Sequence, residues 1–137
     1  MVCTSFLSNA ESCYITEEDQ FALGEKHRKS FKFSFWETPQ AGTVFMIEVP
    51  ASMNDEKFTG ALLVKGPRAK VKDSYGIHVG FMPHDTEQGM LMSAMSMERH
   101  MLEGAELSIS YGHESCVPDP VYKVSELLSD KNNWPYR

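Results

Sequence analysis

The stretch FKFSFW places a phenylalanine at every second position, at Phe31, Phe33 and Phe35, with polar residues between them. Successive side chains of a β-strand point to opposite faces, so this period of two predicts a half-buried strand with one phenylalanine face. A helix would instead spread the three rings around its circumference. Rings on one strand face need a second apolar layer to cover them, which directs the chain toward a layered β fold.

Further segments carry strand signals. The turn-like TPQAG is followed by TVFMIEVP, in which Phe45, Ile47 and Val49 share a face, so the spacing predicts a hairpin with a five-residue loop. The remaining strand segments are GALLVKG (60–66), SYGIHVGFMP (74–83), ELSISY (106–111) and a short VYKV (121–124). Strands clustered in this way favour a sandwich or a small barrel over alternating strands and helices.

Two segments have helix signals. Thr16, followed by three acidic residues, has the pattern of an N-cap for a short helix over 17–23, with Gly24 at its end. From 86 to 103 the apolar period changes to that of an amphipathic helix. Its predicted apolar stripe consists of Met90, Ala94, Met97 and Met101.

The chain of 137 residues has the size of one domain. We predict a mainly β (α+β) fold, an antiparallel β-sandwich or small barrel with one amphipathic helix and extended N- and C-terminal arms. In this division, residues 1–25 form an N-terminal arm with a short helix. Residues 26–116 form the β-rich core domain, including the helix 86–103, and residues 117–137 form a C-terminal arm.

Charge is unevenly distributed within a net charge of −6. Residues 26–72 contain nine Lys and Arg against four Asp and Glu, whereas the segments before and after are acidic. A basic middle between acidic ends fits either an anionic partner or contacts between neighbouring copies of the chain.

The cysteines and the hydropathy pattern indicate the compartment in which the protein is located. Cys3, Cys13 and Cys116 form no C-x-x-C pair, which favours free thiols in a reducing compartment, although a Cys3–Cys13 bridge stays open. No apolar run reaches the roughly 18–20 residues that a membrane-spanning helix needs, and the first residues lack a secretory pattern. We therefore expect a protein in a reducing compartment such as the cytoplasm, neither secreted nor in a membrane.

Known catalytic motifs are missing from the sequence, such as a G-x-S-x-G elbow, an H-E-x-x-H helix or a phosphate loop. His78 lies between two glycines, which favours a bulge or a crossing strand over a ligand site. His84 with Asp85 is better explained as a loop and helix cap than as a catalytic pair. His113 and Cys116 have a metal-compatible spacing but lack the four ligands of a zinc site. We predict no enzyme activity, no cofactor and no metal.

His100 and Glu103 also lie one helical turn apart in the predicted helix 86–103. A single pair of this kind does not make a di-metal site, so we expect both on the solvated face of that helix.

Basic and aromatic residues in the middle of the chain give one alternative function. A single-stranded nucleic acid could lay its phosphates along the cations and stack bases on exposed rings, as on an oligonucleotide-binding barrel. The overall acidity and the shared face of the phenylalanines argue against it. The residues in this alternative are Lys32, Trp36, Lys65, Arg68, Lys70 and Lys72.

The segments GEKHRKSFKFSF (24–35), AGTVFMIEVPASM (41–53) and GALLVKG (60–66) resemble the first strands of small β-sandwich structural proteins of tailed-bacteriophage particles. The shared features are a His-Arg before alternating phenylalanines and then a glycine-containing hairpin. The resemblance implies a structural or decorating subunit that packs against copies of itself or other particle proteins, located in the virion or the host cytoplasm. We therefore predict a non-enzymatic assembly protein, and a small acidic inhibitor of a host protein is a further alternative.

Overall fold

The computed structural model describes residues 15–66, 74–112 and 117–135. The strands are β1 (Lys32–Thr38), β2 (Gly42–Pro50), β3 (Ser52–Met53), β4 (Glu56–Lys65), β5 (Tyr75–His78), β6 (Met82–Pro83), β7 (Met90–Met97), β8 (Ala105–Tyr111) and β9 (Val121–Lys123). The helical segments are α2 (Glu17–His27), η1 (Arg28–Ser30), α3 (Arg99–Leu102), α4 (Val124–Ser129) and η3 (Lys131–Asn133). The fold is mainly β, as predicted.

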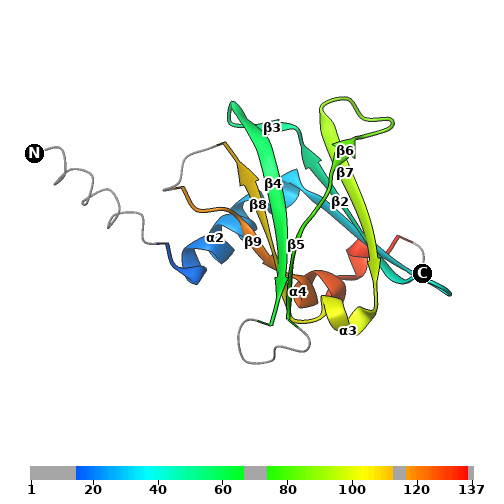
Figure 1. The fold of residues 1–137 in the computed structure, drawn as a ribbon. Helices are drawn as coiled ribbons and strands as arrows, with labels where there is room; N and C mark the ends of the chain where they lie inside the picture. The colour runs from blue at the N-terminus through cyan, green and yellow to red at the C-terminus, as the bar shows by residue number, and fades with distance from the viewer. Residues whose placement is uncertain (1–14, 67–73, 113–116, 136–137) are drawn as a thin grey trace, which may run out of the picture.

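Two antiparallel sheets make up the fold (Figure 1). The first sheet has four strands in the order β1-β2-β7-β6. The second sheet has five strands, in the order β3-β4-β8-β9 with β5 beside β4. The predicted hairpin is confirmed, because β1 and β2 pair over seven residues on each strand, but the predicted five-residue loop is wrong, because Thr38 and Gly42 at its two ends belong to the strands and pair with each other.

The core lies between the two sheets. Phe31, Phe33 and Phe35 are only 3%, 2% and 0% exposed, so the predicted phenylalanine face is buried. Leu63 and Leu107 of the second sheet belong to the same apolar cluster. The alternation in FKFSFW therefore marks one wall of a sandwich, and the opposite wall comes from β4 and β8.

One segment changes from one sheet to the other. The predicted single strand over 74–83 is divided into β5, which pairs with β4, and β6, which pairs with β7. Val79 lies between them, is buried, and donates its backbone N–H to the Ala61 carbonyl at 3.0 Å. Strands that switch sheets form the corners of sandwich folds, and this segment bridges the two layers along one side.

The predicted amphipathic helix over 86–103 is wrong. Met90–Met97 forms strand β7, which pairs with β2 over eight residues, and only Arg99–Leu102 is helical. Met, Ala and Leu are good helix formers, but tertiary context overrides intrinsic propensity, and here a continuous ladder with a buried neighbouring strand outweighs it.

The prediction of an extended C-terminal arm is also wrong, because residues 117–135 pack onto the core. Strand β9 pairs with β8, and α4 buries Val124, Leu127 and Leu128. The Trp134 indole N–H donates to the Leu128 carbonyl at 2.8 Å. The segment closes the sandwich rather than extending from it, because its apolar residues complete the core.

Helix α2 begins as predicted and continues past its predicted end. The Thr16 hydroxyl accepts from the Asp19 N–H at 3.1 Å, as an N-cap does. Gly24 does not end the helix; a Cβ there would lie 2.5 Å from the Val121 carbonyl oxygen, so glycine allows α2 to approach β9. The boundary placed at residue 25 therefore falls inside a helix that packs on the core.

Candidate functional site

The face of the first sheet that points away from the core carries several apolar side chains, and we call it the outer face. The strand register places its side chains in cross-strand rows. Its members are Lys32, Ser34, Trp36, Val44, Met46, Glu48, Met82, Met92, Ala94 and Ser96. Within the described ranges, the helices pack mainly against β1, β8 and β9 rather than against β2 or β7. The central strands thus present this face without a helical layer.

Methionines dominate the middle and one edge of the outer face. Met46 and Met92 are half-buried on neighbouring strands, and Met82 at the β6 edge is 62% exposed. Thioether side chains adapt their shape to irregular partners, which suits a contact surface. The methionines of 90–97 therefore divide between two faces, because Met95 and Met97 pack against the core.

Glu48 is the one acidic member of the outer face, and it is only 7% exposed. Its carboxylate lies 3.2 Å from Nε2 of His84, while Nδ1 of the same ring accepts the N–H groups of Thr86 (3.2 Å) and Glu87 (2.9 Å). Because Nδ1 accepts, the ring proton lies on Nε2 and is donated to Glu48. Both nitrogens are engaged in structure, so this pair has no nitrogen left to act as a base.

The prediction that His84 and Asp85 belong to a cap is confirmed in part. The acceptor of the cap is the imidazole of His84, and the segment after it is a turn rather than a helix. His78 is exposed on β5, and a Cβ on either flanking glycine, Gly76 or Gly80, would meet nothing within 4 Å. Among the described residues, the expected crossing strand is therefore wrong, and the alternative of a bulge is wrong as well, because β5 pairs with β4 without a register shift up to His78.

Metal-binding candidates do not converge in the part of the chain that the structure describes. There, no group of three or more His, Cys, Asp or Glu side chains could hold a metal ion. His100 lies near Glu98 (3.2 Å) and Glu103 near Arg99 (3.7 Å), with all four side chains exposed. His113, Cys116, Cys3 and Cys13 lie outside the described residues.

The three predicted nucleic-acid residues that the structure describes do not all lie on one surface. Lys32 and Trp36 lie on the outer face, whereas Lys65 lies at the end of β4 and its ammonium donates to the His100 carbonyl. Arg68, Lys70 and Lys72 lie outside the described residues. The nucleic-acid alternative stays a prediction, and of its six residues the structure places only the first two on one surface.

Other cations have structural partners that the sequence did not reveal. Arg28 donates to the Phe31 carbonyl (3.1 Å) and to Oδ1 of Asn133 (3.0 Å), and its guanidinium lies 4.8 Å from the centre of the Phe33 ring. Together, these three contacts of Arg28 join the end of helix α2 to strand β1 and the C-terminal segment. Arg28 therefore holds elements together rather than facing an anionic partner.

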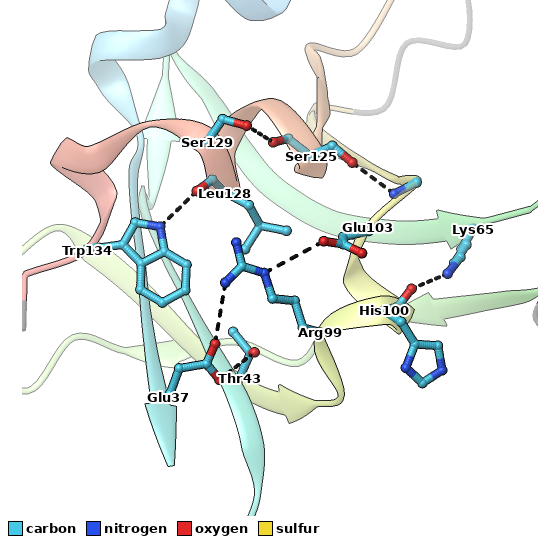
Figure 2. Close-up of polar contacts among 11 residues, drawn as sticks. Glu37, Thr43, Lys65, Arg99, His100, Glu103, Ser125, Leu128, Ser129 and Trp134 are labelled. Atoms are coloured by element: carbon cyan, nitrogen blue, oxygen red, sulfur yellow. Dashed lines mark hydrogen bonds and ion pairs between the residues drawn. The ribbon is translucent and has the colours of Figure 1, made fainter. Parts of the chain in front are cut away.

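Figure 2 shows a second polar cluster of this kind around Arg99. The guanidinium lies 3.6 Å from Glu37 and 3.7 Å from Glu103, and 5.1 Å from the centre of the Trp134 ring. The two ion pairs are about half exposed, and such pairs contribute little individually. The cluster joins the end of β1 to α3 and the C-terminal segment, and the Thr43 hydroxyl donates to the Glu37 carboxylate at 2.9 Å within it.

No family model, curated protein or solved structure matches this chain. Among the helices in the described residues, none combines the length and the apolar character that crossing a bilayer would need. The outer face is therefore the feature of the molecule from which we infer a function.

Proposed function

We propose that this chain is a non-enzymatic assembly protein that packs against copies of itself through the outer face. The observation that supports this function is the methionine surface of Met46, Met82 and Met92, on strands other than those against which the described helices mainly pack. Burying such side chains against a second copy removes apolar area from water, at about 25 cal/mol per Å².

The size of the face sets the expected strength of the contact. Strands of seven to nine residues, with a rise of about 3.4 Å per residue and a spacing of about 4.8 Å, give an area on the order of 400 Å² for three strands. Stable complexes bury about 800 Å² per partner. A single pairing is therefore weak, and it becomes effective where several contacts act together, as in a particle.

The charges around the outer face favour a second copy as the occupant. Lys32 lies at the β1 edge, and Asp85 and Glu87 lie in the turn that follows β6, at the same end of the sheet. A two-fold axis along the strands would set Lys32 of one copy against the acidic turn of the other, twice in each dimer. The buried Glu48 carboxylate already accepts a hydrogen bond from His84, so it needs no new hydrogen-bond donor at this contact.

The wider setting of this assembly follows from the resemblance to phage particle proteins. The resembling segments include β1, β2 and most of β4, which contribute to both walls of the sandwich. We propose on that basis that the self-association serves a virion component, located in the particle or the host cytoplasm. Other particle proteins are the second class of partner.

Sedimentation velocity over micromolar to millimolar concentrations tests the proposal. We expect a reversible dimer whose dissociation constant rises at least tenfold in Met92→Lys, because a charge would be buried at the contact. The matched control is Val64→Lys, on the opposite sheet, where the side chain is 37% exposed. The proposal would be contradicted if the natural chain were a monomer at every concentration. It would also be contradicted if Met92→Lys dimerised as strongly as the natural chain. Nucleic acid that copurifies with the chain would favour the nucleic-acid alternative.

A further inference from the structure

A second surface feature is a cavity of about 240 Å³ that opens to solvent and is surrounded by four segments of the chain. Its walls include Leu23 of α2, Met53 of the β3–β4 hairpin, Tyr111 at the end of β8 and Val117. Pockets for drug-sized ligands usually have about 300–1,000 Å³. This cavity therefore has the size for one long side chain or a small ligand of similar shape.

The β3–β4 hairpin supplies a carboxylate to this cavity. Its two-residue turn has Asn54 and Asp55 at φ 52° and 65°, the left-handed conformation that tight hairpins with a primed turn require. The turn pairs Met53 with Glu56 across the strands. The Glu56 carboxylate lies against Gly112, where a Cβ would come within 2.5 Å of its Oε2. Glu56 thus reaches over the cavity at a position that a side chain at residue 112 would obstruct.

A second acidic residue, Asp119 in the segment 118–120, also lines the cavity. Asp119 accepts the hydroxyl hydrogen of Ser110 at Oδ2, with 2.7 Å between the oxygens. The prolines on both sides restrict the backbone around Asp119, and the Pro120 carbonyl accepts the N–H of Ile109 at 3.1 Å. One carboxylate oxygen is therefore fixed on a rigid segment, which lowers the entropic cost of binding at the other.

The charge of the cavity and its apolar walls together indicate which kind of ligand fits it. None of the described residues that line the cavity is Lys or Arg, so no internal cation neutralises Glu56 and Asp119 there. The two carboxylates and the neighbouring His27 do not form a metal-binding group among the described residues. A compact metal ion would also leave the apolar walls unused. The complementary ligand has an apolar stem that ends in a cation.

We propose that this cavity is a binding site for an alkylammonium or alkylguanidinium group. The source of the group is either a lysine or arginine side chain of a peptide segment, or a small free amine. The stem packs against Leu23, Met53 and Val117, and the cation pairs with Glu56 and Asp119. Within the described part of the chain, no residue that lines the cavity belongs to the outer face, and the proposal does not depend on self-association.

Chemical-shift mapping of the full chain by NMR tests the site with four probes. N-acetyl-arginine methylamide and N-acetyl-lysine methylamide represent a peptide, and n-pentylamine represents a free amine. The uncharged control is N-acetyl-norleucine methylamide. We expect the cationic probes to shift the amide signals of Glu56, Gly112 and Asp119 in a saturable manner. A preference for the amide-flanked probes over n-pentylamine identifies a peptide as the source, and the reverse preference identifies a free amine.

Two variants locate the effect. Glu56→Gln and Asp119→Asn keep the shape of each side chain, and Asp119→Asn retains an oxygen for Ser110. Each should weaken binding about three- to tenfold, and together they should abolish it. Glu126→Gln is the matched control, because Glu126 lines a separate, smaller hollow beside Lys123. Equal binding of the norleucine probe, or unchanged binding of the cations by the double variant, would overturn the proposal.

Discussion

Phe35 and Phe45 stack across the β1–β2 hairpin, with ring centroids 4.6 Å apart and an interplanar angle of 14°. The strand register pairs the two residues directly, and both rings are fully buried. The Trp134 ring lies 5.5 Å from Phe35. This stack therefore connects the first hairpin to the C-terminal segment, and both parts of the chain depend on it for a packed core.

Phe45→Ala should strongly destabilise the fold. Removal of a fully buried ring loses its transfer free energy and leaves a cavity, so the free energy of unfolding should fall by about 3–5 kcal/mol. Urea denaturation followed by circular dichroism measures the change. The control is Val64→Ala on the exposed side of the second sheet, which should cost below about 1 kcal/mol. Equal losses in the two variants would be inconsistent with a core centred on this stack.

Tyr75 gives the fold a dependence on alkaline pH. Burial raises the pKa of its phenol to about 12, and its hydroxyl donates to the Met101 carbonyl at 2.6 Å. The unfolded phenol ionises near pH 10, so its contribution to stability is complete below pH 10 and is lost as the pH rises to about 12. Burial also raises the pKa values of Tyr111 and Tyr122, which adds to the same trend.

Measurements of the urea midpoint at several values between about pH 8 and pH 12 test this trend. The natural chain should lose stability steadily above about pH 10. Tyr75→Phe should be less stable at pH 8, by about 1 kcal/mol for the lost hydrogen bond, and its decline with pH should be shallower. Identical slopes for the two proteins would show that the Tyr75 hydroxyl ionises as freely in the folded state as in the unfolded state.

The strands around FKFSFW could be predicted because their signal is local. Phe31, Phe33 and Phe35 alternate with polar residues, and a period of two is typical of a strand with one buried face. Strand β7 could not be predicted in this way. Its outward positions include Met92 and Ala94, which lack the polar character that marks a solvated strand face. A strand that is apolar on both faces loses its period of two and can match a helical spacing.

The cavity could not be predicted from the sequence either, but for a different reason than β7. Glu56 and Asp119 lie far apart in the sequence, and the tertiary pairing of β4 with β8 brings their segments together. Spacing therefore contains no signal for this site. The turn residues Asn54 and Asp55 offered a partial signal, because both residue types tolerate the left-handed backbone of a tight hairpin.

The contact between His84 and Glu48 predicts a rescue by a second mutation. His84→Asn can still accept the turn N–H groups with its short side chain, but it cannot reach Glu48. The carboxylate would then be buried without its donor, at a cost of about 1–3 kcal/mol. Adding Glu48→Met should restore most of that loss, because a methionine continues the apolar outer face.

A double-mutant cycle from urea denaturation measures this rescue. Additive effects of His84→Asn and Glu48→Met would show that the two side chains do not interact in solution.

The strand β7 predicts an alternating response to charge along 91–97. Leu91, Met95 and Met97 pack against the core, whereas Met92 and Ala94 point outward. Lysine at Met95 should therefore cost several kcal/mol, because the ammonium would be buried without a partner. Lysine at Ala94 should cost below about 1 kcal/mol. Urea denaturation of the single variants, in dilute solution where copies are monomeric, gives the pattern. A helix would place the sensitive positions three and four residues apart, so losses at Met90, Ala94 and Met97 with tolerance at Met95 would contradict the strand.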